Sequence, residues 1–349
     1  MTHDAGQDAE TPFDLEATVA GLVGRNALFV VNHSGGKDSQ AMFAKLLGMV
    51  PREQIVVVHA DLGHVEWEGA QEHIRDTIDG LPLLVCRNNN KTFVEMMERR
   101  GMFPSPTTRQ CTSDFKRGPI ERTIRHYLKD NPQFGGLVVN CVGLRAQESP
   151  GRRKQKPFRL NEGNSVAGRE WYDLLPIHDM QIEEVWKTIS EAGTQDYWQT
   201  KVPGGQKPHA VYSQGMSRFS CKLCIMATDA DLATAARLDP KNYAMYVGLE
   251  RKFGRTMMMP RNVPVPGGKP KMVARSLEDI TGIKADFVTY PEYYHPEVDF
   301  SGNVEADRAR QAAKALLAEA AAPVAEPLVD DEPLPEPDYE PGTQLSFAL

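Results

Sequence analysis

The sequence contains no apolar run that approaches the length of about eighteen residues needed to span a membrane, and no secretory signal pattern follows Met1. We therefore expect a cytoplasmic protein that has no membrane partner. Cysteine is also scarce. Five cysteines, an odd number in a chain of 349 residues, do not suit the disulfide framework of a secreted domain. These cysteines are expected to be buried thiols, ligands or redox groups.

Basic residues are missing from the last part of the chain. Between Ala315 and Leu349 there are eight acidic residues and no Lys or Arg, so the formal net charge of −7 leaves about +1 on the remainder. The stretch is rich in Pro, Glu and Ala, a composition that cannot bury a core. We therefore expect an acidic, disordered tail over residues 305–349.

The positive charge of the body gathers in two groups, at 145–159 and 251–275. Each group is either a solvated basic face or a surface for phosphate or nucleic acid. If the partner is nucleic acid, three aromatic residues are candidates to stack its bases: Trp67, Tyr212 and Phe219. The basic residues are Arg145, Arg152, Arg153, Lys154, Lys156 and Arg159 in the first group, and Arg251, Lys252, Arg255, Arg261, Lys269, Lys271 and Arg275 in the second.

The most informative motif is the hexapeptide Ser34-Gly35-Gly36-Lys37-Asp38-Ser39, which follows the apolar run 27–31 and precedes the helix-like segment 40–47. A strand, a loop with two glycines and a helix together build a phosphate cradle, because backbone N–H groups converge at the helix N-terminus. The spacing is not that of a Walker A motif. The plainer interpretation is a strand-to-helix turn with Ser39 as the N-cap.

Further apolar runs alternate with helix-like segments and predict a doubly wound parallel α/β sheet. The expected strands are 27–31, 55–60, 83–86 and 137–142, and the expected helices are 68–78, 92–99 and 117–128. In such sheets, ligands bind at the carboxyl ends of the strands. The candidate loops are therefore 33–39, 61–64 and 143–149.

Six motifs in the order of the chain resemble those of the phosphoadenosine phosphosulfate (PAPS) reductase family. The hexapeptide Ser34 to Ser39 resembles the PP-loop of enzymes that cleave adenine nucleotides between the α- and β-phosphates. The resemblance implies a Rossmann-like domain of the adenine nucleotide α-hydrolase type over 21–226, after a segment 1–20 and before a helical and loop-rich extension, 227–304. The motifs are Ser34 to Ser39; Asp61-Leu62-Gly63; Cys111 with Lys116 and Pro119; Gly143-Leu144-Arg145 with Glu148-Ser149 and Arg152-Arg153; Leu175 to Asp179 leading to Glu183-Glu184-Val185-Trp186; and Cys221-Lys222-Leu223-Cys224.

The resemblance also implies roles for particular residues. The hexapeptide would hold the phosphates of ATP, or of PAPS, together with Mg²⁺, with Lys37, Asp38 and Arg145 as catalytic candidates. Asp61 would lie near the adenosine or a metal-bound phosphate. Guanidinium groups suit sulfonyl or pyrophosphate oxygens, so Arg152 and Arg153 would neutralise them, and Lys116 is a weaker candidate for the same role.

The cysteines divide into two sets. Cys86 and Cys141 lie in strand-like apolar runs and are expected to be inert buried thiols. Cys111, Cys221 and Cys224 lie in polar surroundings, where a Cys-x-x-Cys pair suits a redox dithiol, half a zinc site or part of an iron–sulfur cluster.

The resemblance favours one of these three interpretations. Related adenylyl-sulfate reductases bind a [4Fe–4S] cluster through a cysteine pair and a Cys-x-x-Cys, whereas this chain has Cys111-Thr112. Three thiolates would leave one iron open, the pattern of sulfur-transferring relatives. Zn²⁺ held by the three cysteines and His209, or no metal, are the alternatives.

The family's reductases attack sulfur with a cysteine near the C-terminus, and no cysteine follows Cys224. We therefore expect an enzyme that cleaves ATP and activates an acceptor, such as nucleic acid, for sulfur transfer. A reductase that uses a cysteine supplied from elsewhere, and a non-catalytic nucleotide-binding module of a DNA-modification assembly, are the alternatives. The peptide Gln344–Leu349 resembles the short peptides that dock on the bacterial sliding clamp, which makes that clamp a candidate partner.

Overall fold

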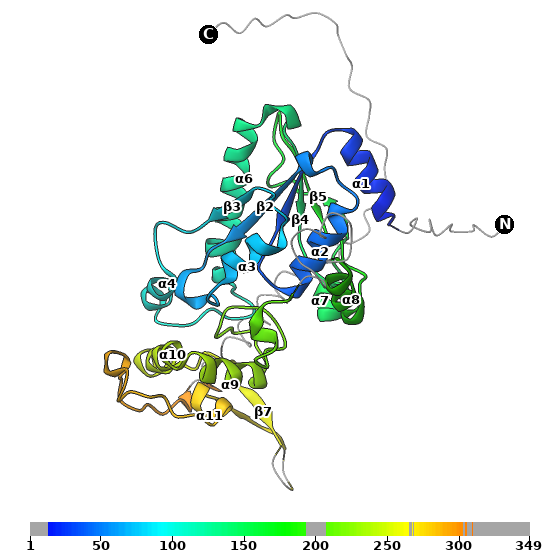
Figure 1. Cartoon of the computed structure of the whole chain (residues 1–349). Helices are drawn as coiled ribbons and strands as arrows, with labels where there is room; N and C mark the ends of the chain where they lie inside the picture. The colour runs from blue at the N-terminus through cyan, green and yellow to red at the C-terminus, as the bar shows by residue number, and fades with distance from the viewer. Residues whose placement is uncertain are drawn as a thin grey trace, which may run out of the picture. The chain divides into compact units, whose positions relative to one another are not determined.

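The computed structural model describes residues 13–192, 207–264, 267, 269–302, 304–305 and 309 (Figure 1). The predicted acidic tail, with its clamp-docking peptide Gln344–Leu349, lies outside the described residues apart from positions 305 and 309. Within the described part, every helix is too short or too polar to cross a membrane.

A mostly parallel six-stranded sheet forms the centre of the fold (Figure 1). Its order is β3-β2-β1-β4-β6-β5, and β5 is the one strand that runs antiparallel, against β6. The four predicted strands are confirmed within one residue at their ends. The strands are β1 (Leu28–Asn32), β2 (Ile55–Ala60), β3 (Leu83–Cys86), β4 (Leu137–Cys141), β5 (Phe158–Leu160) and β6 (Glu170–Leu174).

Helices cover both faces of this sheet, as the continuous apolar strands require. On one face, Phe29 and Val57 pack with residues of the helices α1, α2 and α3, including Met42 and Ile74. On the other face, Val30 and Val56 pack against Ile124 of α6, and Trp171 of β6 completes that core. The helices of this part are α1 (Leu15–Gly24), α2 (Lys37–Leu47), α3 (Ala70–Thr77), α4 (Phe93–Arg100), α5 (Gln110–Thr112), α6 (Gly118–Asp130), α7 (Pro150–Arg153) and α8 (Ile182–Ala192).

A second core joins the predicted helical extension to the loops beyond β2. Tyr243 and Val247 of the extension pack in one cluster with Leu62 and Val65, which follow β2, and with Met96 of α4. The cluster also includes the partly buried Cys-x-x-Cys segment, so the extension is in contact with the edge of the sheet where ligands are expected. The extension contains α9 (Asp229–Leu238), α10 (Pro240–Phe253) and α11 (Leu277–Thr281), with the antiparallel pair β7 (Arg261–Val263) and β8 (Lys271–Val273).

The close approach of α10 to the chain near residue 293 gives a test of the second core. A Cβ at Gly248 would lie 2.1 Å from the backbone oxygen of Tyr293, so Gly248→Ala forces the two segments apart. We expect this change to lower the free energy of unfolding by about 1–3 kcal/mol, the usual cost of overpacking. The measurement is denaturant unfolding followed by circular dichroism.

The matched control is Gly21→Ala in α1, where nothing lies within 4 Å of the added carbon. This control should keep or raise stability, because Ala favours helix more than Gly does. Equal stability of the two variants would contradict the packing of α10 against Tyr293.

Candidate functional site

The predicted phosphate cradle, residues 34–39, joins β1 to α2. Gly35 adopts a positive φ of 83°, which favours glycine, and Gly36 is the N-cap of α2 with no side chain to close the helix end. The two predicted serines brace the loop from within: the Ser34 N–H donates to Ser39 Oγ at 3.2 Å, and Ser39 Oγ donates to the Gly36 carbonyl at 2.7 Å. Ser39 lies inside the helix, so the plain-turn interpretation with Ser39 as N-cap is wrong.

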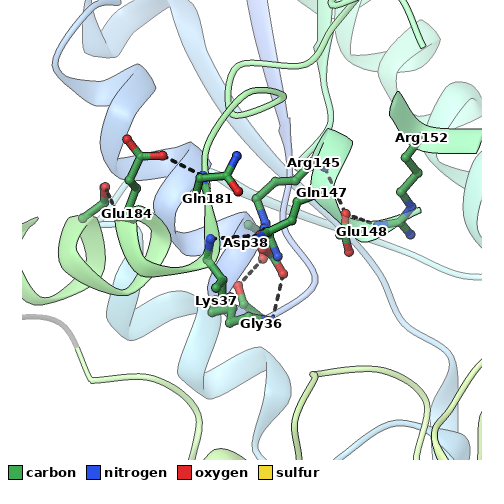
Figure 2. Close-up of polar contacts among 12 residues, drawn as sticks. Gly36, Lys37, Asp38, Arg145, Gln147, Glu148, Arg152, Gln181 and Glu184 are labelled. Atoms are coloured by element: carbon green, nitrogen blue, oxygen red, sulfur yellow. Dashed lines mark hydrogen bonds and ion pairs between the residues drawn. The ribbon is translucent and has the colours of Figure 1, made fainter. Parts of the chain in front are cut away.

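The three catalytic candidates meet at the start of α2 (Figure 2). Lys37 Nζ lies 3.2 Å from Asp38 Oδ2, and Arg145 Nε lies 2.7 Å from Asp38 Oδ1. Both cations are buried, at 6% and 5% exposure. Because burial of an unpaired charge is costly, the single carboxylate of Asp38 is what allows two cations to sit at this helix end.

Arg145 also links the cradle to α8. Its Nη1 donates to Gln147 Oε1 at 2.6 Å, and the same oxygen accepts the N–H of Ile182, the first residue of α8, at 3.0 Å. The backbone N–H of Arg145 donates to Glu148, whose carboxylate pairs with Arg152 (Figure 2). The loop after β4 is thereby held against α2 and α8. The sequence analysis placed Gln147 in the candidate loop 143–149 but gave it no role.

Two aromatic residues proposed for base stacking lie instead on the cradle. Tyr212 Oη accepts the backbone N–H of Lys37 at 3.0 Å and that of Phe219 at 3.2 Å. The ring of Phe219 lies against the loop, since a Cβ built on Gly36 would be 2.9 Å from Phe219 Cβ. The Lys37 N–H is the first donor of α2, the kind that binds phosphate at a helix N-terminus. In this structure Tyr212 and Phe219 cover that donor.

Two buried histidines, His33 and His59, make hydrogen bonds beneath the loop 34–39, and the sequence analysis did not predict them. Burial, together with nearby His73 and His59, lowers the pKa of His33 to about 3, so its ring stays neutral. His33 Nδ1 therefore accepts the Gly35 N–H, at 3.1 Å. His59 contacts the His33 carbonyl through Nδ1 and Glu66 through Nε2, at 3.0 and 3.1 Å.

The remaining anion-binding candidates are placed differently from one another. Asp61 pairs with Arg87 at 2.5 Å and accepts the Gly63 N–H at 2.8 Å, so it closes the turn after β2. Arg152 forms an ion pair with Glu148, which also accepts the backbone N–H of Arg145. Arg153 is exposed, and the described contacts do not join it to residues 34–39.

The cysteines follow their predicted division. Cys86 and Cys141 are buried, as predicted, and burial raises the pKa of both thiols. Cys111, Cys221 and Cys224 share one neighbourhood with Lys116, which is solvent-accessible and lies in the π-helical turn Ser113–Arg117 before α6. Burial raises the pKa of Cys221 to about 12, although Lys116 acts in the opposite direction. The Cys221 thiol is therefore protonated at neutral pH in this arrangement.

These thiols do not form a metal site as they stand. Within the ranges that the structure describes, no group of three or more His, Cys, Asp or Glu side chains is arranged to hold a metal ion. His209, the fourth zinc ligand of the alternative prediction, lies on the cradle side, in ring contact with His73 and Phe219. The [4Fe–4S] and Zn²⁺ assignments stay predictions.

Many cations of the two basic groups are already paired. In the first group, Arg145, Arg152 and Arg159 have carboxylate partners. In the second, Arg251, Lys252, Arg261 and Arg275 have carboxylate partners. Paired cations offer less charge to a nucleic-acid backbone than the sequence suggests.

Comparison with known proteins finds a family domain that part of this chain is similar to. Residues 29–197 match the model of the phosphoadenosine phosphosulfate reductase domain. The chain is 26% identical over 184 residues to an uncharacterised 37.8 kDa protein of Escherichia phage 186, covering 53% of this chain. The chain spans about half of that curated relative, 48% of its length.

Two solved structures are also similar. A phosphoadenylyl-sulfate reductase from Candida auris, in a phosphate complex, is 12% identical with a TM-score of 0.38, over 60% of this chain and 89% of that one. An FMN adenylyltransferase from Candida glabrata, in complex with FAD and inorganic pyrophosphate, is 14% identical with a TM-score of 0.29, over 53% and 62% of the two chains.

The contact of Tyr212 with the cradle leads to a direct prediction. Tyr212→Phe removes the hydroxyl that occupies the Lys37 N–H and leaves that donor free for a phosphate oxygen. Because one hydrogen bond contributes about 0.5–1.5 kcal/mol, we expect ATP to bind roughly threefold to tenfold more tightly. Isothermal titration calorimetry with MgATP measures the change.

Tyr294→Phe is the matched control, since Tyr294 is exposed and lies outside the cradle. This variant should bind ATP like the unaltered chain. Weaker binding by Tyr212→Phe would show that the hydroxyl contacts the nucleotide and does not compete with it.

Proposed function

We propose that this chain cleaves ATP between the α- and β-phosphates, because residues 29–197 match the phosphoadenosine phosphosulfate reductase domain, whose family implies an adenine nucleotide ligand. The cleavage would transfer AMP to an oxygen of an acceptor and so prepare that oxygen for displacement by sulfur. The observation that carries the proposal is the grouping of Lys37, Asp38 and Arg145 at the N-terminus of α2.

The positive charges of the site suit the departure of pyrophosphate. Pyrophosphate leaves with more negative charge than it carries within ATP, so a site for this step needs fixed positive charge beside the leaving group. Lys37, Arg145 and the first N–H groups of α2 supply it within one buried cluster. Mg²⁺ enters with the nucleotide as part of the substrate.

Each residue of the cluster has a defined task in this proposal. The N–H groups at the start of α2, with that of Lys37 released from Tyr212, bind the phosphates that leave as pyrophosphate, and Lys37 and Arg145 neutralise their oxygens. Asp38 orients both cations and is a positioning residue. An acceptor oxygen then bonds to the α-phosphorus as the bond to the β-phosphate oxygen breaks, which gives acceptor–AMP and pyrophosphate.

The second half of the reaction needs sulfur. A donor of the hydrosulfide class would displace AMP from the activated carbon, so that the C–S bond forms as the C–O bond breaks. Cys111, Cys221 and Cys224 are the candidates to deliver it, because Lys116 lies among the three thiols. Transfer requires deprotonated sulfur, and burial, which raises the pKa of the Cys221 thiol, opposes that deprotonation.

The first half-reaction is tested by its products. With MgATP and total tRNA or genomic DNA as acceptor probes, we expect AMP and pyrophosphate, separated by anion-exchange chromatography. Asp38→Ala leaves two buried cations without their shared carboxylate and should lower the rate by about 100-fold or more. Cys224→Ser should keep pyrophosphate release, because the thiols act after activation.

Asp76→Ala, an exposed acid of α3, is the matched control and should leave the rate unchanged. Thermal unfolding of Asp38→Asn, which keeps the side-chain shape, separates loss of activity from loss of the fold. Formation of ADP and phosphate, or reduction of PAPS to sulfite with thioredoxin, would contradict the proposal.

Metal analysis tests the cysteine prediction independently. The resemblance predicts about four iron and four sulfide per chain after anaerobic purification, lost in Cys111→Ser and kept in the control Cys86→Ala. The described thiol positions would then have to rearrange around the cluster. Zinc at about one per chain, or protein free of metal, would overturn the iron–sulfur prediction. Neither result would contradict the proposed cleavage of ATP.

A further inference from the structure

A short two-stranded ribbon, formed by β7 and β8, lies at the outer end of the helical extension (Figure 1). It lies beyond residue 197, where the match to the family domain ends. Every residue of β7 and two of the three residues of β8 are exposed. Because an isolated two-stranded ribbon is marginally stable in water, this ribbon depends on the extension to hold its base.

A buried carboxyl group holds that base. Glu250 of α10 is completely buried, and its two oxygens accept the backbone N–H of Met257, before β7, at 2.7 Å and that of Leu277, after β8, at 2.9 Å. The side chains of Met257 and Leu277 are themselves buried in the second core. Since a buried carboxyl group is costly without partners, these two hydrogen bonds fix both ends of the ribbon. The ribbon is thus an anchored protrusion of the fold.

The register of the two strands places cations and apolar side chains on one face of the ribbon. Arg261 lies opposite Val273, and Val263 lies opposite Lys271. Opposite residues of an antiparallel pair point to the same side, and alternate residues of a strand share a face, so these four side chains lie together. Val263 and Val273 are 41% and 37% exposed. The face is therefore accessible to a partner.

Most of the positive charge at the ribbon is not neutralised. At its base, Arg261 and Arg275 share the carboxylate of Asp229, at 3.3 and 2.6 Å. Lys269 and Lys271 are exposed, and neither has a carboxylate partner among the residues that the structure describes. Four cations are thus set against a single carboxylate.

The charge and the shape of the ribbon together indicate the class of partner. The segment 251–277 contains seven Lys and Arg and no Asp or Glu, so it attracts a polyanion. Double-stranded DNA carries about one negative charge per 1.7 Å of helix axis, and its major groove, about 12 Å wide, admits a two-stranded β-ribbon. The major groove of an RNA duplex is too deep and narrow for side chains to read. Exposed valines suit the DNA groove, where apolar side chains contact the thymine methyl group.

We propose that the β7–β8 ribbon docks on double-stranded DNA. Lys269 and Lys271 contact phosphates, and the face that carries Val263 and Val273 turns toward the groove. Asp229 limits the contribution of the two arginines at the base. That this DNA is the acceptor of sulfur rests on the proposed function, whereas the binding itself does not.

The test is fluorescence anisotropy of the full chain with a short labelled DNA duplex, without ATP. Replacement of both lysines, Lys269→Ala with Lys271→Ala, should weaken binding by about tenfold or more. The same variant should lower the slope of log K against log salt concentration by about 2, because each phosphate contact releases about 0.9 counterion. An RNA duplex of the same sequence should bind the unaltered chain at least about fivefold more weakly than DNA does.

Two matched variants assign the binding to the ribbon. Asp229→Asn removes the carboxylate that two arginines share, keeps the side-chain shape, and should tighten DNA binding by about threefold or more. Lys154→Ala with Lys156→Ala removes two exposed lysines of the first basic group. This control should keep the affinity within about twofold, since salt screens charges that do not contact the DNA. Thermal unfolding shows whether each fold is kept, and the gain expected of Asp229→Asn is not a result that a damaged fold produces.

Three results would overturn the inference. Unchanged affinity of the ribbon variant, or an equal loss in the control, would place the DNA elsewhere. Equal binding of the RNA duplex would remove the role of the groove. Displacement of the DNA by poly-glutamate at equal charge concentration would assign the ribbon to acidic protein segments. None of these results depends on turnover, so failure of ATP cleavage and failure of DNA docking are separate outcomes.

Discussion

The carboxylate of Asp38 is the interaction on which the rest of the site depends. It holds Lys37 from its own helix and Arg145 from the loop after β4, 107 residues away, at the end of the neighbouring parallel strand. Two cations buried to this degree require a shared counter-charge. Arg145 also connects to α8, because it donates to the Gln147 side-chain oxygen, which accepts the N–H of Ile182. One ion-pair cluster thus joins two strand ends and two helices into the cradle.

Residues beyond the match to the family domain cover part of this cluster. Tyr212 and Phe219 cover the first N–H donor of α2, and the cysteine segment follows them directly. Tyr212 Oη also accepts the N–H of Phe219, two residues before Cys221, so the residues that cover the Lys37 N–H belong to the segment that carries the cysteine pair. Further along, residues of α10 line a cavity together with Asp61 and the loop after β2.

The sequence was sufficient for the parts of the fold that depend on local pattern. Strands β1 to β4 are largely continuous apolar runs, and the two glycines of residues 34–39 predict the loop between β1 and α2. Strand β6 was missed because Glu170-Trp171-Tyr172-Asp173-Leu174 mixes polar and apolar residues, and β5 has only three residues. The placement of Tyr212 on the Lys37 N–H, 175 residues apart, depends on tertiary packing that no local pattern contains. Neighbouring Arg152 and Arg153 have different surroundings for the same reason.

The central claim is that residues 34–39 hold the phosphates of ATP, and a crystal structure with MgATP or a non-hydrolysable analogue tests it most directly. We predict phosphate oxygens at the N–H groups of this loop, Lys37 and Arg145 turned toward them, and the Tyr212 hydroxyl displaced from the Lys37 N–H. A nucleotide bound elsewhere, with Tyr212 still on Lys37, would contradict the account.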